Sequence, residues 1–227
     1  MQAPIERCLL LTRKCAIPTP ALFLDRDGVI IEDCHHIRDP DQVRLCDGAL
    51  ALIRAAQSGG CPVVVITNQS GISRGLITWR DVERVNKRML ELLGPEAPIA
   101  AIYANGHGPD APSQSWRKPS PAMLRAAAAD LSLDLQRSLL IGDRLTDLRA
   151  GAAAGVTAVW HVLSGHGQRE REAVHRWSEA LRRSAAASTD LRVQLLASLE
   201  DFPFQQLPSP LSSEKSGRLS AGDSIKG

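Results

Sequence analysis

The sequence has few aromatic residues, no long apolar run and no excess of either charge. Aromatic residues make up 4% of the 227 residues and apolar residues 44%, which is enough for a largely aliphatic core. The 27 basic residues nearly cancel the 25 acidic ones, and this balance argues against a protein that coats nucleic acid. No stretch approaches the length of a membrane span. We therefore expect neither nucleic acid nor a membrane as partner.

The sequence also lacks a C-x-x-C motif, because none of its five cysteines is spaced in this way. An odd number of cysteines suits a reducing compartment, and most of them are expected to be small buried apolar side chains. The apolar run near the amino end is interrupted by Arg13 and Lys14 and is too short for a signal-peptide core. We expect a cytoplasmic monomer.

Short apolar runs alternate with stretches of helical periodicity. The runs typical of buried strands are 21–24, 63–66, 99–103, 138–141 and 157–162. The stretches typical of helices are 49–57, 78–93, 121–131 and 146–154. Thr78 and Ser120 are candidate N-caps, and Pro121 suits a first helical turn. This alternation predicts an α/β fold in which a parallel sheet carries helices on both faces and ligands bind at the carboxyl ends of the strands.

The two ends of the chain differ from its middle. Residues 1–19 show no clear period and are interpreted as an N-terminal extension, followed by one domain over 20–204. Within that domain, 170–187 is expected to be a charged helix and 191–199 an edge strand or short helix. Residues 205–227 are rich in Ser, Pro, Gly and Lys, which predicts a disordered tail.

Carboxylates follow the first and the fourth internal strand. Asp25 and Asp27 lie two residues apart before Gly28, so they can share one metal ion while performing different tasks. Asp143 follows the run 138–141 and can complete such a site. Asp147 can orient a lysine or a metal-bound water, although it equally suits a first-turn acid that faces the helix dipole. Taken alone, the segment with Asp25, Asp27 and Gly28 would be interpreted as a solvated acidic loop.

Groups suited to phosphate follow the other strands. Thr67, Asn68, Gln69 and Ser70 offer a hydroxyl, amides and main-chain N–H groups after the run 63–66. Arg117 and Lys118 precede the helix at 121–131, where a lysine can act as a point charge on a transferring phosphoryl group. Each cluster alone is weak evidence for a function. The order Asp-x-Asp, Thr, Lys, Asp on successive strand ends is a much more specific signal.

These motifs resemble the haloacid dehalogenase superfamily of aspartate-nucleophile phosphatases, in the branch of heptose-bisphosphate and histidinol-phosphate phosphatases. The resemblance covers residues 21–165. The matching runs are Phe-Leu-Asp-Arg-Asp-Gly at 23–28, Val-Ile-Thr-Asn-Gln-Ser-Gly-Ile at 65–72, Arg-Lys-Pro at 117–119 and Ile-Gly-Asp at 141–143. The resemblance implies a three-layer, Rossmann-like fold with a minimal cap, because the space between Gly28 and Thr67 is too short for a large one.

The resemblance also implies a role for each catalytic residue. Asp25 would attack phosphorus, Asp27 would act as general acid and then as general base, and Thr67 and Lys118 would hold the phosphoryl group. Mg²⁺ would be bound by the Asp25 carboxylate, the Asp27 main-chain carbonyl and Asp143. The positions that match the family's substrate contacts are Asp33, Cys34, His35, His36, Thr67, Asn68, Gln69, Ser70, Arg117, Lys118 and Arg144.

The sequence departs from the family pattern in two places. The relatives carry a zinc-binding loop with cysteines before the Arg-Lys pair, whereas here His107 stands without any cysteine between 99 and 118. One imidazole cannot close a tetrahedral site, so Mg²⁺ and no zinc is expected. Cys34, His35 and His36 replace His, Gly and Tyr of the heptose enzymes, and Arg144 replaces Lys. The reaction is therefore better determined than the substrate.

The favoured function is hydrolysis of a sugar bisphosphate of the heptose 1,7-bisphosphate type, a small phosphorylated metabolite. The alternative is a phosphatase for histidinol phosphate or another small phosphomonoester. A receiver-type signalling domain also uses acidic residues, Thr and Lys around Mg²⁺, but Asp27, two residues after Asp25, disfavours it. An inactive binding module is disfavoured by the intact catalytic set.

Overall fold

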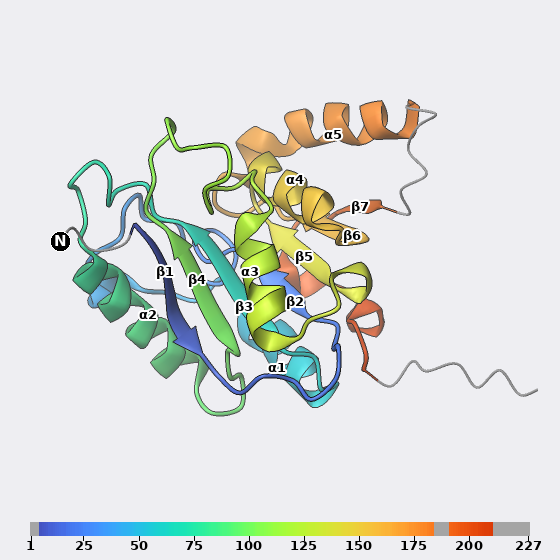
Figure 1. Ribbon diagram of the computed structural model, residues 1–227, viewed down its shortest axis with the longest axis horizontal. Coiled ribbons are helices and arrows are strands. Elements are labelled where there is room, and N and C mark those ends of the chain that lie inside the picture. Colours follow the sequence, from blue (N-terminus) through green and yellow to red (C-terminus); the bar gives the residue numbers. More distant parts are fainter. Residues whose placement is uncertain (1–4, 184–190, 211–227) are drawn as a thin grey trace, which may run out of the picture.

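The computed structural model describes residues 5–183 and 191–210 and contains one seven-stranded sheet within them (Figure 1). The strands lie in the order β1-β4-β3-β2-β5-β6-β7. β1 pairs antiparallel with β4, and the other neighbours are parallel. The strands are β1 (Glu6–Leu11), β2 (Leu22–Leu24), β3 (Val63–Asn68), β4 (Ala101–Asn105), β5 (Leu139–Gly142), β6 (Ala158–His161) and β7 (Arg192–Leu195).

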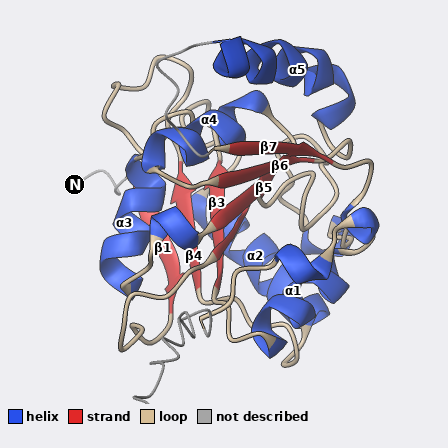
Figure 2. Cartoon of the chain, turned by 90° about the vertical axis from the view of Figure 1, so that its right-hand side faces the viewer, coloured by secondary structure: helices blue, strands red, loops and turns tan. Residues whose placement is uncertain are grey.

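Helices cover both faces of the sheet, which confirms the predicted three-layer α/β fold (Figure 2). The α-helices are α1 (Ala49–Ser58), α2 (Trp79–Leu93), α3 (Ala122–Leu131), α4 (Leu145–Ala154) and α5 (Gly167–Arg183). The 3₁₀ helices are η1 (Pro40–Gln42), η2 (Leu135–Arg137), η3 (Leu199–Asp201) and η4 (Phe204–Gln206). The predicted strands and helices of the parallel part therefore form, with ends shifted by one to two residues.

The core consists of two apolar layers because successive side chains of a strand point to opposite faces. In β2, Leu22 and Leu24 belong to the layer beneath α1 and α2, whereas Phe23 belongs to the layer beneath α3 and α4. Val63 and Val64 of β3 divide between the layers in the same way. Since both faces of each central strand are buried, these strands read as continuous apolar runs in the sequence.

Of the two predicted N-caps, Thr78 is confirmed and Ser120 is not. Thr78 is the N-cap of α2, where its side chain accepts a hydrogen bond from the Asp81 N–H and Asp81 accepts one from the Thr78 N–H. Helix α3 begins at Ala122, one residue later than predicted, and Pro121 is its N-cap. The Ser120 hydroxyl still accepts a hydrogen bond from the Ala122 N–H, so Ser120 supports the turn before the helix.

The amino-terminal segment differs from the prediction. Residues 1–19 were expected to be an extension, but β1 forms an edge strand of the sheet and pairs from Glu6↔Asn105 to Leu11↔Ala101. The pairing shifts register between Cys8 and Leu10, and β1 is half-exposed on an edge, so its sequence shows no strict alternation. Residues 1–4 lie outside the described chain.

The carboxyl-terminal segment keeps contact with the domain beyond residue 204. β7 confirms the predicted edge strand in 191–199, and η4 extends the described structure into the region expected to be a tail. There, Leu207 packs against the core and the Ser209 carbonyl accepts a hydrogen bond from Arg137 Nη2. The rest of the predicted tail, 211–227, and the end of the predicted charged helix, 184–187, lie outside the described residues.

Short loops, rather than a cap domain, connect β2 to α1. Between β2 and α1 the chain forms η1 and two isolated bridges, Asp27↔Ile31 and Ile31↔Leu45. Within the described chain, no helix combines the length and the apolar character needed to span a lipid bilayer. The segment 25–48, which connects β2 to α1, contains no cap domain in the described structure.

Candidate active site

The candidate site lies where the strand order reverses. From β2 the chain proceeds to β3 and β4 on one side of the sheet, and then to β5 and β6 on the other side. Asp25 follows β2 and Asp143 follows β5, its neighbour, so both lie at the carboxyl ends of adjacent strands. Ligands bind at such a topological switch point in open α/β sheets.

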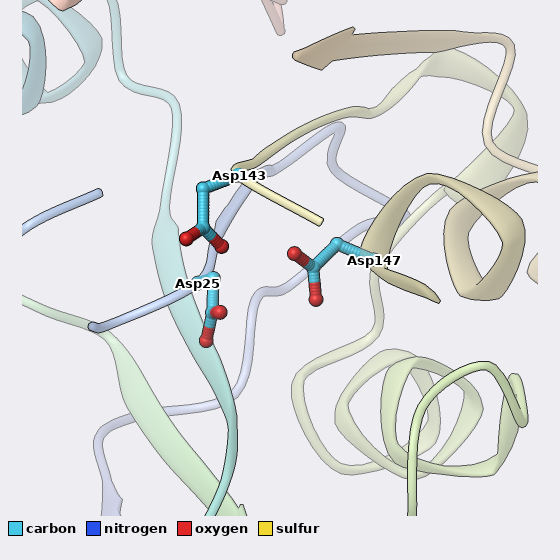
Figure 3. A group of neighbouring side chains, drawn as sticks. All are labelled: Asp25, Asp143 and Asp147. Atoms are coloured by element: carbon cyan, nitrogen blue, oxygen red, sulfur yellow. The ribbon is translucent and has the colours of Figure 1, made fainter. Parts of the chain in front are cut away.

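Three buried carboxylates gather at this point, and Figure 3 shows Asp143 directed toward Asp25, with Asp147 directed toward the two from the side. Oxygen atoms of Asp25, Asp143 and Asp147 all lie within 4.8 Å of one another. The sequence predicted Asp25 and Asp143 as metal ligands and left the role of Asp147 open. Its carboxylate belongs to this group and also accepts a hydrogen bond from the Arg144 N–H at the start of α4. Asp147 therefore serves both the site and the helix.

Two glycines allow the Asp143 carboxylate to lie against the main chain. A Cβ atom on Gly28, at φ +82°, would lie 2.6 Å from Asp143 Oδ2. Gly165, at φ +56°, lies against Gly28, and a Cβ atom there would also clash with the same oxygen. The His166 N–H donates to Asp143 Oδ2 over 2.7 Å, whereas Asp143 Oδ1 is buried without a hydrogen-bond partner among the described residues. An orphaned buried carboxylate oxygen beside two other carboxylates fits a divalent cation that prefers oxygen ligands.

Lys118 is the cation of this cluster. Its Nζ lies 2.9 Å from Asp25 Oδ1 and 2.7 Å from Asp147 Oδ1, and it donates to the Ile66 carbonyl oxygen over 2.9 Å. The side chain is only 1% exposed. We call Asp25, Lys118, Asp143 and Asp147 the inner cluster. With every group ionised, three carboxylates and one ammonium leave two negative charges, which a divalent cation would balance.

Burial controls the protonation of the inner cluster. It raises the pKa of Asp25 to about 7, because desolvation and the nearby Asp147 and Asp27 carboxylates outweigh the ion pair with Lys118. Burial, Asp147 and Asp25 raise the pKa of Asp143 to about 8. Burial alone would lower the pKa of Lys118, but Asp147 and Asp25 raise it above its ordinary value, so this lysine stays charged.

The predicted polar segment 67–70, which begins in the last two residues of β3, supports Asp27 and Lys118 through its side chains. Gln69 Nε2 donates to Asp27 Oδ2 over 2.7 Å and to Thr67 Oγ1 over 2.8 Å. Asn68 holds the main chain of Lys118 on both sides, because its Oδ1 accepts from the Lys118 N–H and its Nδ2 donates to the Lys118 carbonyl. Thr67 is buried beneath the pocket, and its hydroxyl lies 3.4 Å from Asp27 Oδ2.

The loop between β4 and Lys118 is fastened by the amino-terminal strand. The Glu6 carboxylate accepts a hydrogen bond from the Trp116 N–H over 2.6 Å and lies 3.4 Å from His107 Nε2. The Trp116 ring packs against Tyr103 with 5.4 Å between the centroids, and Arg117 Nη1 donates to the His107 carbonyl oxygen. The lone loop histidine thus has a carboxylate neighbour that the sequence did not indicate.

Above the inner cluster opens a polar pocket of about 290 Å³. Most predicted substrate positions line it, and the lining also includes Arg74, Thr146 and His166, which sequence reasoning missed. Two predicted substrate positions do not line the pocket: Cys34, whose side chain is exposed, and Thr67, which is buried. The predicted positions that do are Asp25, Asp27, Asp33, His35, His36, Asn68, Gln69, Ser70, Arg117, Lys118 and Arg144.

Three arginines gather in the outer part of the pocket, and we call Arg74, Arg117 and Arg144 the outer arginines. Burial and the positive charges of Arg144 and Arg74 lower the pKa of Arg117. Within residues 5–183 and 191–210 none of the three forms a salt bridge with a carboxylate. Like charges that converge without a counter-ion indicate a place for an anionic ligand.

His166 lines the pocket together with Asp33 and His35. Its Nε2 lies 2.8 Å from Asp33 Oδ2, and its ring lies 5.9 Å from the His35 ring. Burial and Arg144 lower the pKa of His166, although Asp33 opposes this shift. The signal that could have found His166 is its position just beyond the carboxyl end of β6, because a parallel sheet gathers functional groups at that edge.

Comparisons with known proteins agree with this geometry. The family described as HAD-hydrolase-like matches residues 115–188. A D-glycero-beta-D-manno-heptose-1,7-bisphosphate 7-phosphatase of Mesorhizobium japonicum is 47% identical over 150 residues, which cover 63% of this chain and 69% of the relative. A D-glycero-alpha-D-manno-heptose-1,7-bisphosphate 7-phosphatase of Burkholderia mallei is 40% identical over 143 residues, which cover 60% of this chain and 76% of that relative.

A solved structure extends the similarity to the fold. The D,D-heptose 1,7-bisphosphate phosphatase from B. bronchiseptica, complexed with magnesium and phosphate, superposes with a TM-score of 0.65 at 30% identity. The match covers 79% of this chain and 93% of that protein. The chain therefore belongs to the HAD-like phosphatases. In enzymatic terms it is a phosphatase, which confirms the class of reaction expected from its motifs.

Proposed function

We propose that this phosphatase removes one phosphate from a sugar bisphosphate of the heptose 1,7-bisphosphate type, with Mg²⁺ as cofactor and Asp25 as nucleophile. The observation that carries the proposal is the inner cluster, a buried Asp-Lys-Asp arrangement in a chain 47% identical to a relative named for that substrate. Such a cluster is suited to the binding and displacement of a phosphoryl group, because it combines a nucleophile with a fixed positive charge.

In the proposed first half-reaction, a carboxylate oxygen of Asp25 attacks phosphorus and the bond from phosphorus to the sugar oxygen breaks. Asp27 gives its proton to that oxygen, so the sugar leaves as an alcohol. The Lys118 ammonium lies 2.9 Å from the attacking carboxylate and fixes its direction. In the second half, Asp27 takes a proton from water, the water oxygen attacks phosphorus, and Asp25 is released with inorganic phosphate.

Asp25, Asp143 and the Asp27 main-chain carbonyl are the groups that we expect to hold Mg²⁺, with Asp147 close beside them. Magnesium, when bound, supplies positive charge beside the phosphoryl oxygens and offsets their repulsion from the carboxylates. The solved relative with magnesium and phosphate supports this choice. We expect no zinc, because the loop before Lys118 offers His107 and no cysteine.

The outer arginines support a substrate with a second phosphate. The inner cluster engages one phosphoryl group, so Arg74, Arg117 and Arg144 are left to bind the charge at the far end of the sugar. His166 and Asp33, which also line the pocket, offer hydrogen-bonding groups to sugar hydroxyls. We propose a cytoplasmic enzyme that acts as a monomer on a small phosphorylated metabolite.

A substrate comparison tests this proposal. Purified protein with Mg²⁺ is given both anomers of D-glycero-D-manno-heptose 1,7-bisphosphate, because the relatives are named for different anomers. Heptose 7-phosphate and histidinol phosphate are measured in parallel, and phosphate release gives kcat/KM. We expect one anomer of the bisphosphate to exceed both monophosphates at least about tenfold. A higher kcat/KM for histidinol phosphate would reject the sugar assignment and keep the phosphatase mechanism.

A further inference from the structure

The residue between the two catalytic aspartates is buried. Arg26 stands between Asp25 and Asp27, and its side chain is the largest one that is fully buried within the described chain. Removing a guanidinium from water is costly unless hydrogen bonds and an opposite charge replace the lost hydration. The buried guanidinium of Arg26 therefore needs hydrogen-bond acceptors and a negative charge inside the protein.

Asp27 is the principal partner of Arg26. Arg26 Nη2 lies 2.9 Å from Asp27 Oδ1 and 3.0 Å from Oδ2, and Arg26 Nε lies 3.2 Å from each oxygen. The guanidinium thus grips both oxygens in a two-pronged arrangement that a lysine cannot reproduce. This grip fixes the rotation of the Asp27 carboxylate as well as its position.

The far side of the guanidinium is anchored to helix α2. Arg26 Nη1 donates to Asn86 Oδ1 over 2.9 Å, and Asn86 is itself buried. On its other side, the Asp27 carboxylate accepts a hydrogen bond from Gln69 Nε2 over 2.7 Å. Asp27 nevertheless faces the pocket, with 22% of its side chain exposed. A chain of hydrogen bonds therefore runs from α2 through Arg26 to a carboxylate at the pocket floor.

We propose that Arg26, anchored by Asn86, is a positioning residue that holds Asp27 in the orientation required for proton transfer to the leaving oxygen. The inference rests on the proposed function, in which Asp27 is the general acid and base. A carboxylate at the pocket floor has freedom about two side-chain torsions, and proton transfer requires it within hydrogen-bond reach of one oxygen of the substrate. Arg26 removes this freedom before the substrate arrives.

The competing role for Arg26 is purely structural, as the cation of a buried ion pair in the core. The two roles differ in how variants respond to the leaving group. p-Nitrophenyl phosphate and phenyl phosphate have similar sizes, but nitrophenolate leaves without a proton far more readily than phenolate does. Loss of a positioned acid slows the hydrolysis of phenyl phosphate more than that of p-nitrophenyl phosphate. Loss of structure slows the hydrolysis of both esters equally.

The experiment measures kcat/KM for both aryl phosphates with the full chain and Mg²⁺. The variants are Arg26→Lys, Arg26→Met and Asn86→Ala. We expect the preference for p-nitrophenyl phosphate to rise about tenfold in both Arg26 variants, and less in Asn86→Ala, since general acid catalysis contributes about a hundredfold or more. Arg26→Lys keeps a buried cation and Asn86→Ala keeps Arg26, so the test survives if Arg26→Met fails to fold.

Arg171→Met provides a matched control. Arg171 is a half-buried arginine that donates to the main-chain carbonyls of His161 and Leu196, away from Asp27. We expect this variant to lose stability and to keep the wild-type ratio of the two substrates. In the Asp27→Asn background, adding Arg26→Lys should leave the ratio unchanged, because there is no acid left to position.

The outcomes separate this inference from the proposed function. If the wild type releases phosphate neither from these esters nor from heptose 1,7-bisphosphate, the proposed function fails and the inference fails with it. If the wild type is active and Asp27→Asn raises the preference for p-nitrophenyl phosphate, the general acid is established. The inference is then overturned when Arg26→Lys and Asn86→Ala slow both substrates by the same factor.

Discussion

The inner cluster and the outer arginines meet in one pocket but are built in opposite ways. Lys118 is buried between two carboxylates, so the inner cluster contains the counter-charge for its own cation. The outer arginines repel one another and have no carboxylate within salt-bridge distance in the described chain. The reacting end therefore holds its lysine with the protein's own carboxylates, whereas the recognition end awaits charge from its ligand. Substitutions should therefore affect the two ends differently.

The largest effect is expected at the nucleophile. Asp25→Asn keeps the size of the side chain and removes the attacking carboxylate, so Mg²⁺-dependent phosphate release should fall by more than about a thousandfold. Circular dichroism should remain that of the wild type. Substantial residual turnover in the purified variant, after contaminating phosphatase has been excluded with a mock preparation, would remove Asp25 from this role.

Lys118→Met should damage both catalysis and stability. Its loss leaves Asp25 and Asp147 close together without a counter-ion, and breaking such a buried pair typically costs about 3–5 kcal/mol in the free energy of unfolding. Urea denaturation without Mg²⁺ measures this loss. The control is Arg54→Met, which breaks an exposed pair with Glu96 and should change stability by less than about 1 kcal/mol. Equal stability of the two variants would contradict the prediction.

Metal and protons should compete for the inner cluster. The pKa values of about 7 for Asp25 and about 8 for Asp143 exceed the value of 3.8 for a free aspartate, so the folded protein binds more protons than the unfolded one. The stability contributed by this difference is present at low pH and is lost as pH rises from 4 to 8. Mg²⁺ requires the deprotonated carboxylates, so its stabilising effect should grow across the same range.

Thermal unfolding with EDTA or with Mg²⁺, at pH 6 and at pH 8, measures this competition. The increase in Tm on adding Mg²⁺ should be about 3 °C or more larger at pH 8 than at pH 6. Asp143→Asn should reduce that difference, because it removes one of the titrating ligands. An identical increase at both pH values in the wild type would show that these carboxylates are already ionised at pH 6.

The outer arginines should affect recognition more than chemistry. Arg74→Ala should raise KM for a sugar bisphosphate about tenfold and change kcat little, since a desolvated charged contact is worth about 1–3 kcal/mol. Hydrolysis of a monophosphate should be nearly unaffected. Arg88→Ala, on the exposed face of α2, is the matched control. A loss of kcat on both substrates would instead assign Arg74 to the reacting end.

The smallest effects are expected at the carboxyl end. Deleting 211–227 should leave Tm within about 2 °C of the wild type, because this segment is almost devoid of large apolar residues. Deleting 207–227 also removes Leu207, which packs against the core, and the Ser209 carbonyl bonded to Arg137. The longer deletion should therefore be the less stable of the two, and a large loss from the shorter one would show that 211–227 contributes to the domain.

The parallel core was predictable because its strands are buried on both faces and appear as unbroken apolar runs. The place of the candidate site was predictable because Asp25, Thr67, Lys118 and Asp143 occur in a fixed order in the sequence, at or beyond the carboxyl ends of those strands. Strand β1 escaped prediction, since an edge strand with a register shift lacks a clean period. The partnership between Arg26 and Asn86 joins residues 60 positions apart, and no local pattern reports such a contact.

The clasp between Glu6 and Trp116 makes the edge strand and the active-site loop a single unit of local opening. β1 is held by β4 on one side only, so it detaches at a lower free energy than the central strands do. When β1 detaches, the Trp116 N–H loses its acceptor at the same moment. The main-chain amide protons of β1 and that of Trp116 should then exchange with solvent at a common rate, ahead of those in β2 and β5. We therefore expect fraying at the edge of the sheet to loosen the attachment of Trp116, two residues before Lys118.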